Sequence, residues 1–130
     1  MGAIIHHMLK AAPAPVAPFS HAVEQDGWIF VTGQMPFPGL SIDEPYPEGI
    51  EAQTDQVLRN LQTVLRGCGL DIGHVLSVRV YLTHFEADYD RMNAVYATWF
   101  PAGRRPARTC IGVTALAKGA RVEIDMVARR

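Results

Sequence analysis

The sequence contains few cysteines, almost no net charge and no long hydrophobic run. Only two of its 130 residues are cysteines, Cys68 and Cys110, which excludes a disulfide framework and favours reduced thiols. Twelve basic and thirteen acidic residues give a net charge of −1, so a general surface for nucleic acid is not expected. No apolar run approaches the roughly 20 residues of a membrane span, and residues 1–10 lack the pattern of a signal peptide. We therefore expect a cytoplasmic protein that binds neither nucleic acid nor membranes.

Metal ligands at useful spacing are also missing from the sequence. The five histidines include no pair at helical metal-ligand spacing, and the adjacent His6 and His7 lie in an N-terminal tail. Surface or helix-capping roles are therefore favoured for the histidines. We expect no metal and no organic cofactor.

The length fits one domain, preceded by a short extended segment. Alanine and proline alternate through residues 11–18, a composition typical of polyproline-like backbone. We expect residues 1–17 to form an extended lead-in and residues 18–130 to form a single domain.

Hydrophobic periodicity predicts five strands and two helices. Apolar residues at three- and four-residue steps predict helices from residue 50 to about 68 and over residues 85–99. Alternating or β-branched runs predict strands over residues 19–23, 28–32, 75–83, 107–114 and 121–128. The order is ββαβαββ, and the strand–helix–strand unit over residues 75–114 favours a parallel crossover. Two helices can cover only one face of such a sheet, so the other face meets water or another subunit.

Polar residues on the last two predicted strands indicate a binding site. If these strands form a hairpin, Gly112 lies opposite Glu123, and Arg108 lies opposite Val127 on the same uncovered face. A guanidinium, a small gap and a carboxylate then share one face, an arrangement suited to a small acid. An ion-pair network between packed subunits explains the same residues equally well.

Several short motifs together resemble the reactive-intermediate deaminase family (Rid, also called YjgF). The strand-ending motif of that family resembles residues 31–34, its Asn-x-x-Tyr helix motif resembles Asn93 and Tyr96, and its Pro-Tyr motif near the N-terminus resembles Pro18 and Phe19. The C-terminal signature resembles residues 106–110 followed by 122–125, and the resemblance runs from about residue 18 to residue 130.

The resemblance implies a fold, an assembly and an activity. The family has a chorismate-mutase-like α+β fold, which implies a mixed six-stranded sheet with two helices on one face. Its members form homotrimers with active sites between subunits. Its founding activity is hydrolysis of enamines and imines, such as 2-aminoacrylate, to 2-keto acids and ammonia without a cofactor. A cofactor-free deaminase is therefore the function that the resemblance implies.

The resemblance also assigns roles to individual residues. Arg108 would bind the substrate carboxylate, and Glu123 would orient or activate the attacking water. The backbone carbonyl of Cys110 would help to hold that water. The pocket would further be lined, partly from the adjacent subunit, by Phe19, Thr32, Gly33 and Asn93.

The sequence differs from the family pattern at two positions, and two functions other than a deaminase have also to be weighed. Phe19 replaces a usual tyrosine, and Gly112 replaces a usual glutamate, so a bulkier or more apolar imine is a candidate substrate. A non-enzymatic trimer that binds small carboxylate metabolites is the main alternative, because Arg108 would serve it equally. A ribonuclease is disfavoured by the net charge and by the absence of an acid–base histidine pair.

Overall fold

The structure is a computed structural model that describes residues 2–130. It consists of six strands, two α-helices and two 3₁₀ turns. Most lie within a few residues of the ranges expected from hydrophobic periodicity. They are β1 (Ile5–His7), β2 (Ala22–Gln25), β3 (Trp28–Gln34), α1 (Ile50–Gly67), η1 (Ile72–His74), β4 (Val75–Leu82), α2 (Phe85–Trp99), β5 (Ala107–Gly112), η2 (Ala117–Gly119) and β6 (Val122–Arg129).

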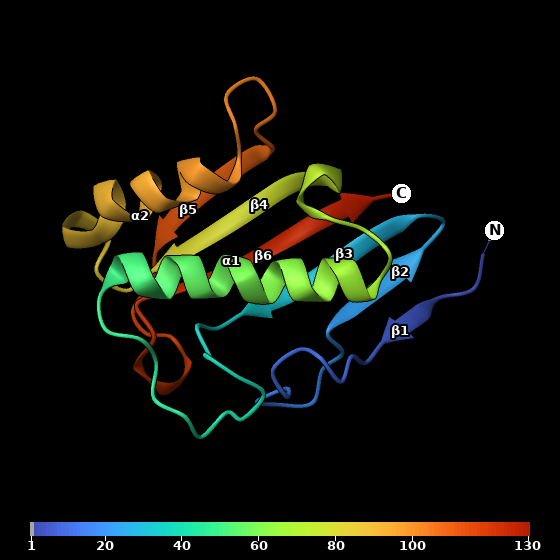
Figure 1. The fold of residues 1–130 in the computed structure, drawn as a ribbon, viewed down its shortest axis with the longest axis horizontal. Coiled ribbons are helices and arrows are strands. Elements are labelled where there is room, and N and C mark those ends of the chain that lie inside the picture. The colour runs from blue at the N-terminus through green and yellow to red at the C-terminus, as the bar shows by residue number, and fades with distance from the viewer. Residues whose placement is uncertain (1) are drawn as a thin grey trace.

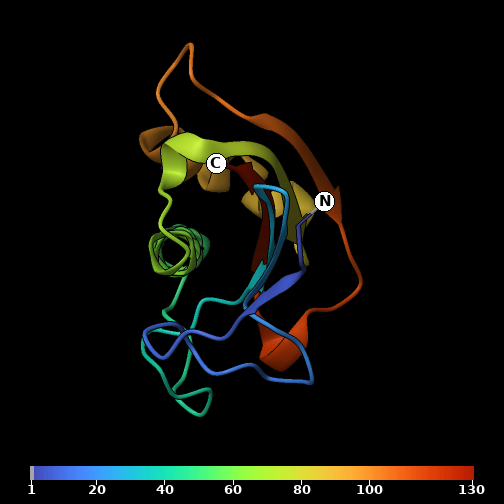
Figure 2. The same ribbon diagram turned by 90° about the vertical axis from the view of Figure 1, so that its right-hand side faces the viewer.

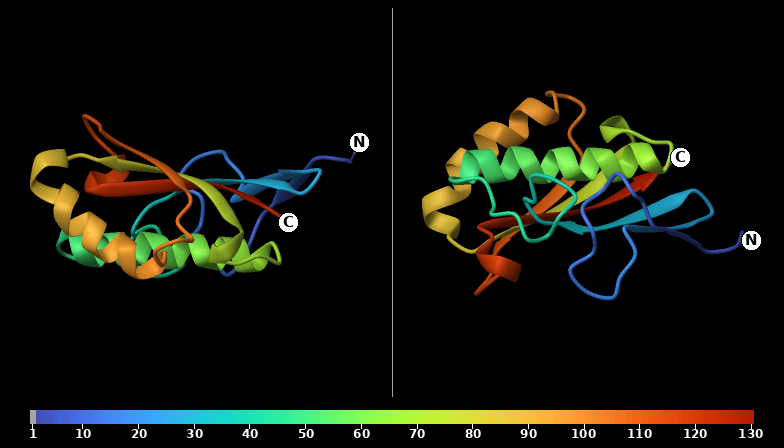
Figure 3. Two further views of the ribbon diagram at one scale, coloured as in Figure 1. Left: turned by 90° about the horizontal axis from the view of Figure 1, so that it is seen from above. Right: turned by 60° about the horizontal axis from the view of Figure 1, so that its bottom comes forward.

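One mixed sheet carries both helices on the same face. The strand order is β1-β2-β3-β6-β4-β5, and only the β4–β5 pair is parallel (Figure 1). Seen from above, α1 and α2 both lie on one side of the sheet (Figure 3, left), and Figure 2 shows α1 end-on beside it. The expected α+β fold, with six strands and two helices on one face, is confirmed.

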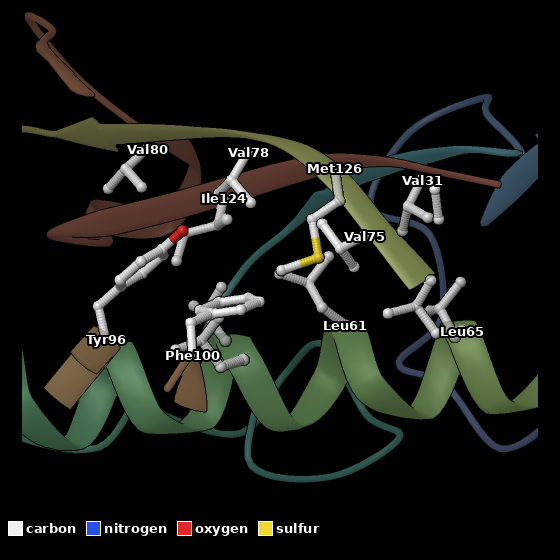
Figure 4. Packing of buried hydrophobic residues seen from close by; sticks show 14 of the residues in the cluster. Val31, Leu61, Leu65, Val75, Val78, Val80, Tyr96, Phe100, Ile124 and Met126 are labelled. Carbon is white, nitrogen blue, oxygen red and sulfur yellow. The ribbon is translucent and has the colours of Figure 1, made fainter. Parts of the chain in front are cut away.

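The core lies between α1 and the sheet. Leu61 and Leu65 are fully buried and point from α1 toward the sheet, where Met126 of β6 points back at them (Figure 4). On β6, alternate residues are buried from Val122 to Ala128, as a central strand with one covered face requires. The helix ends at Gly67, with Cys68 as its C-cap, as the glycines around it predict.

The sixth strand comes from the segment expected to be an extended lead-in. β1 pairs antiparallel with β2, and the chain beyond it is held by His21. This histidine is 3% exposed; Nδ1 accepts from the Leu9 amide at 2.9 Å, and Nε2 lies 2.8 Å from the Pro13 carbonyl. The expectation of a surface or capping role is therefore wrong for His21. It is confirmed for His74, which caps η1 by accepting the Asp71 amide.

The predicted hairpin between the last two strands is wrong. β4 lies between β5 and β6, pairing in parallel with β5 and antiparallel with β6. The central position allows β6 to bury every second side chain, whereas β5 at the edge leaves Ile111 47% exposed. The parallel strand–helix–strand connection that the sequence also favoured is confirmed by the β4–β5 pairing.

Candidate active site

The Glu123 side chain lines a cavity at one end of the sheet. The lead-in, the loop between β3 and α1, and η2 come together at this end (Figure 1). The cavity has a volume of about 310 Å³. Its lining comprises Pro13, Ala14, Pro15, Val16, Phe19, Thr32, Gly33, Gln34, Met35, Phe37, Ala117 and Glu123.

A β-bulge in β3 shapes this cavity. Val31 pairs with Met126 and Gln34 pairs with Ile124, so β3 contains one residue more than β6 over this interval. The bulge contains Thr32 and Gly33, and the Thr32 hydroxyl donates to the Ser20 carbonyl at 2.6 Å. A Cβ at Gly33 would overlap the Glu123 carboxylate. Glycine is therefore required here by close approach to the glutamate, not by backbone conformation.

The Glu123 carboxylate has no partner among residues 2–130. No hydrogen-bond donor and no cation lie within bonding distance of it, although the residue is only partly exposed. Burial, followed by the negative charge of Asp125, raises the pKa of Glu123 above its usual value. Asp125, on the same face of β6, accepts two hydrogen bonds from Arg79 at 2.8 and 2.9 Å and one from the Tyr81 hydroxyl at 3.0 Å. Of the two carboxylates, only Glu123 accepts no hydrogen bond within residues 2–130, so both of its oxygens are available to a ligand.

Arg108 lies in a separate cavity under α2. This second cavity has a volume of about 320 Å³ and shares no lining residue with the first. Arg108 Nη1 donates to Asn93 Oδ1 at 2.6 Å, and Nη2 donates to the Tyr89 hydroxyl at 3.3 Å. The lining comprises Asn93, Tyr96, Ala97, Arg105, Pro106 and Arg108.

The Arg108 guanidinium is held by aromatic rings and has no counter-ion among residues 2–130. Its central carbon lies 4.8 Å from the centroid of the Tyr96 ring, within the range of a cation–π contact. No carboxylate comes within 4 Å of it, whereas Arg79 and Arg121 each have a carboxylate within that distance. A guanidinium has five N–H donors, and the two hydrogen bonds to protein leave others available for a carboxylate ligand.

The predicted site residues therefore form two groups within one chain. Phe19, Thr32, Gly33 and Glu123 line the first cavity, and Asn93 and Arg108 line the second. Cys110 lines neither cavity; it follows Arg108 on the same face of β5 and packs against the core.

The expectation that Arg108 and Glu123 share one sheet face is wrong. In the parallel β4–β5 register, Arg108 lies beside Val78 and Cys110 lies beside Val80, and both valines are buried on the helix side. Glu123 alternates with the buried residues of β6 and so faces the other way. Gly112 is not near Glu123 either, since a Cβ on Gly112 would meet Phe85 of α2.

Sequence reasoning did not assign a role to the tyrosines that hold Arg108. Tyr89, Asn93 and Tyr96 follow one another at spacings of four and three residues, so they share one face of α2. Tyr96 is also part of the hydrophobic core, because it is only 5% exposed. A polar asparagine between two tyrosines on the same helix face was the available signal for a binding role.

Neither cavity has the donors of a metal site. Within residues 2–130, no three His, Cys, Asp or Glu side chains cluster closely enough to hold a metal ion. Over the same part of the chain, neither helix combines the length and hydrophobicity needed to cross a bilayer.

Comparisons with known proteins establish the family to which this chain belongs. The family model described as Endoribonuclease L-PSP matches residues 9–130. The structure of YyfA from Yersinia pestis, a member of the Rid protein family, superposes with a TM-score of 0.89 at 32% identity, covering 98% of this chain and 100% of that one. The chain belongs to this family, the reactive-intermediate deaminase (Rid or YjgF) family.

Two further relatives carry names that bear on function. The mouse protein named 2-iminobutanoate/2-iminopropanoate deaminase is 36% identical over 132 residues, which cover 98% of this chain and 94% of the mouse protein. The structure of Escherichia coli TdcF with bound serine has a TM-score of 0.87 at 25% identity and covers 97% of this chain and 98% of that one. The family thus includes a protein named as an imine deaminase and one crystallised with an amino acid.

Proposed function

We propose that this protein hydrolyses 2-imino acids and their enamine tautomers to 2-keto acids and ammonia. The observation that carries the proposal is the pair of uncompensated charges: Arg108 has no carboxylate partner and Glu123 has no cation partner within residues 2–130. A buried or half-buried charge is normally paired, so two unpaired groups of opposite sign suit a ligand that needs both. The mouse relative named as an imine deaminase supports the reaction type.

The proposal requires the two groups to meet across an interface between copies. Arg108 and Glu123 occupy different cavities on opposite faces of the sheet. The helix-free face also exposes apolar side chains, including Phe30 at 55% and Ile111 at 47%, which favours burial against another subunit. We propose a homotrimer in which Arg108 of one copy completes the Glu123 cavity of the next.

The chemistry follows from the two groups. Arg108 would hold the carboxylate of the protonated imine, with Thr32, Gly33 and Phe19 around the reacting carbon. The Glu123 carboxylate would take a proton from water as the water oxygen bonds to C2, which gives a carbinolamine, and would pass that proton to the amine nitrogen. Loss of the hydroxyl proton to Glu123 would then form the C=O bond of the 2-keto acid as the C–N bond breaks and ammonia leaves. The proton on Glu123 would pass to the released ammonia, which gives ammonium and regenerates the carboxylate. The raised pKa of Glu123 suits a group that accepts and returns a proton.

The backbone carbonyl of Cys110 is the further proposed partner of the water. Cys110 lies two residues beyond Arg108 on β5, so a water held there would be close to a carboxylate bound by the guanidinium. The Cys110 thiol takes no part in the proposed reaction, because burial raises its pKa and keeps it protonated.

Mixing two inactive variants tests both the residues and the interface. Arg108→Ala and Glu123→Gln should each abolish the acceleration of ammonia release, above the spontaneous rate, from imines generated in solution by an amino-acid oxidase. If each site takes Arg108 from one copy and Glu123 from another, refolding equal amounts together should restore about one quarter of the wild-type activity, because one interface in four then has both residues. Sedimentation velocity should report a trimer for all three proteins. No recovery on mixing, with trimers formed, would contradict the shared site.

A binding protein for small amino or keto acids is the second candidate function. The E. coli relative crystallised with serine favours it, since binding needs only the Arg108 half-site and the enclosing cavity. On this alternative, Glu123→Gln leaves ligand affinity unchanged in calorimetry, and no imine substrate is turned over by the wild-type chain.

A further inference from the structure

Arg108 is not the only unpaired cation in its cavity. Six of the ten arginines lie within 4 Å of a carboxylate in the described part of the chain, namely Arg59, Arg66, Arg79, Arg91, Arg121 and Arg130. Arg105 is not among them, and it lines the same cavity of about 320 Å³ as Arg108. The lining of this cavity contains no acidic residue. Two positive charges therefore face one cavity without a counter-ion among residues 2–130.

The Arg105 side chain is tethered at one nitrogen and free at the others. It lies in the turn between α2 and β5, where the Arg104 amide donates to the Pro101 carbonyl at 3.0 Å. Arg105 Nε donates to the Phe100 carbonyl at 3.1 Å, and Phe100 is only 2% exposed. The bond therefore holds the guanidinium against a buried residue. A guanidinium has five N–H donors, so both Nη atoms of Arg105 are left for a ligand.

Tyr96 lies close to both guanidiniums. The central carbon of Arg108 lies 4.8 Å from the centroid of the Tyr96 ring. Burial raises the pKa of Tyr96, and the charges of Arg108 and then of Arg105 oppose this rise. Two unpaired guanidiniums beside one ring repel each other, and an anion bound between them would remove that repulsion.

The proposed reaction uses only one of these two charges. Arg108 would hold the carboxylate that every 2-imino acid has, and this group cancels one positive charge of the cavity. A second carboxylate on the ligand would be repelled by Glu123 in the other cavity, whose lining contains no lysine, arginine or histidine. On the Arg105 side it would instead meet the Nη donors in a charge-assisted contact.

We infer that Arg105 binds a second carboxylate of the ligand, and that the enzyme prefers 2-imino acids with an acidic side chain. The inference rests on the proposed function, because Arg108 holds the first carboxylate while Glu123 of the adjacent copy acts on C2. The imine derived from glutamate has both carboxylates and fits this description. It differs from the more apolar imine expected from Phe19 and Gly112, because neither of these residues lines the cavity that holds the two arginines.

Calorimetry with two keto acids of equal chain length tests the second contact without requiring turnover. 2-Oxoglutarate has two carboxylates and 2-oxopentanoate has one, and both are products of the proposed class of reaction. We expect 2-oxoglutarate to bind the wild-type protein at least about fivefold more tightly, because it gains a charge-assisted contact with an exposed guanidinium. The ratio of the two affinities should decrease in high salt, since salt screens an exposed cation.

Arg105→Gln and Arg104→Gln separate a specific contact from general attraction by charge. Both variants remove one positive charge from the same turn, but Arg104 lines neither cavity. The affinity ratio should fall to about one in Arg105→Gln and keep its wild-type value in Arg104→Gln. Equal affinities in the wild type, or an equal decrease of the ratio in both variants, would overturn the inference. An unchanged ratio in Arg105→Gln with weaker trimers in sedimentation velocity would also overturn it, because Arg105 would then pair with a neighbouring copy.

Turnover of two imines separates this inference from the proposed function. D-Aspartate oxidase acting on D-glutamate supplies the dicarboxylic imine, and D-amino-acid oxidase acting on D-norvaline supplies the monocarboxylic imine of equal length. We expect kcat/KM to favour the glutamate-derived imine by at least about fivefold in the wild type, and this preference to be lost in Arg105→Gln. Equal kcat/KM for the two imines in the wild type overturns the preference and leaves the deaminase standing. Absence of turnover with both imines contradicts the deaminase, whereas an affinity ratio that depends on Arg105 still supports the second carboxylate contact.

Discussion

Two glutamates in the same sheet have opposite surroundings. Glu24 of β2 is 6% exposed and accepts two hydrogen bonds from Arg130, at 2.7 and 3.0 Å, and lies 2.9 Å from His7 Nε2. These bonds lower the pKa of Glu24 to about 2, and the hydrogen bonds from Arg130 have the largest effect. Glu123 of β6 has no such partner, and burial raises its pKa. The same side chain is therefore held as a fixed anion at one place and kept able to accept a proton at another.

The difference shows that hydrogen-bond donors, rather than burial, separate the carboxylate with a lowered pKa from the one with a raised pKa. Arg130 also donates to the Cys68 carbonyl at 2.6 Å, so the Glu24 cluster ties the last strand to the end of α1. Arg79, which lies on the same face of the sheet as Glu123, is already engaged by Asp125. Removing charge from the two glutamates should consequently affect different properties of the protein.

Glu123→Gln gives the largest expected effect, on activity alone. The amide cannot take a proton from water, and loss of a general base typically lowers kcat/KM by about 10²- to 10⁴-fold. The free energy of unfolding at pH 7 should stay equal or rise slightly, because the variant no longer buries an unpaired charge. Steady-state ammonia release and urea unfolding measure the two quantities. A loss of stability would mean that Glu123 has a structural partner.

Gly33→Ala should act on activity through the position of the Glu123 carboxylate. The added Cβ overlaps the carboxylate, which lies at the end of a flexible side chain and must turn away. A displacement of about 1 Å in a catalytic group can cost up to about 100-fold in rate, so we expect kcat/KM to fall by about 10- to 100-fold. Gly73→Ala is the matched control, because nothing lies within 4 Å of its added Cβ. Equal rates in the two variants would argue against a positioned carboxylate.

Glu24→Gln should show the converse behaviour. The amide loses the charge-assisted bonds to Arg130 and His7, at a cost of about 2 kcal/mol in the free energy of unfolding. Its kcat/KM should equal that of the wild type, because Glu24 lines neither cavity. Urea unfolding of the wild type, Glu24→Gln and Glu123→Gln side by side makes the comparison direct.

The sequence was sufficient for both helices, for every strand but β1, and for six of the residues that line the two cavities. The stripe from Val57 to Leu65 forms the buried face of α1, and the alternation of β6 separates its buried face from Glu123. These patterns are local, since each depends on the periodicity of one helix or one strand. The family motifs added Asn93, whose contact with Arg108 spans 15 residues and does not follow from the periodicity of one helix.

Strand order could not be obtained in the same way. A strand pattern fixes which residues share a face but not which strand lies next to it, and the hairpin between β5 and β6 satisfied the alternation as well as the true pairing through β4. The error reversed the face of Arg108, whose correct side is shown by the burial of Val78 beside it and by its hydrogen bond to Asn93 of α2. The anchoring of the lead-in by His21 was missed because a single histidine after a proline-rich segment has no characteristic pattern.

The pH dependence of stability gives the smallest expected effect and the sharpest contrast between the two glutamates. The pKa of Glu24 is lowered from 4.5 to about 2, so its contribution is complete above pH 4.5 and is lost as the pH falls toward 2. The advantage of the wild type over Glu24→Gln should therefore shrink below pH 4.5, by about 1 kcal/mol for each pH unit.

Glu123 should give the opposite sign in a different pH window. Its pKa is raised in the folded state, so folding is penalised while the group is charged, and the penalty disappears as the pH falls through the raised pKa toward the ordinary value of 4.5. Any advantage of Glu123→Gln over the wild type at pH 7 should thus vanish by pH 4.5, where the Glu24→Gln deficit is still complete. The acid limb of kcat/KM should lie in the same window, above the usual glutamate range, because the proton that relieves the penalty also removes the base. Urea unfolding and imine turnover from pH 4 to pH 8 measure both, and an acid limb without the matching change in stability would assign the limb to another group.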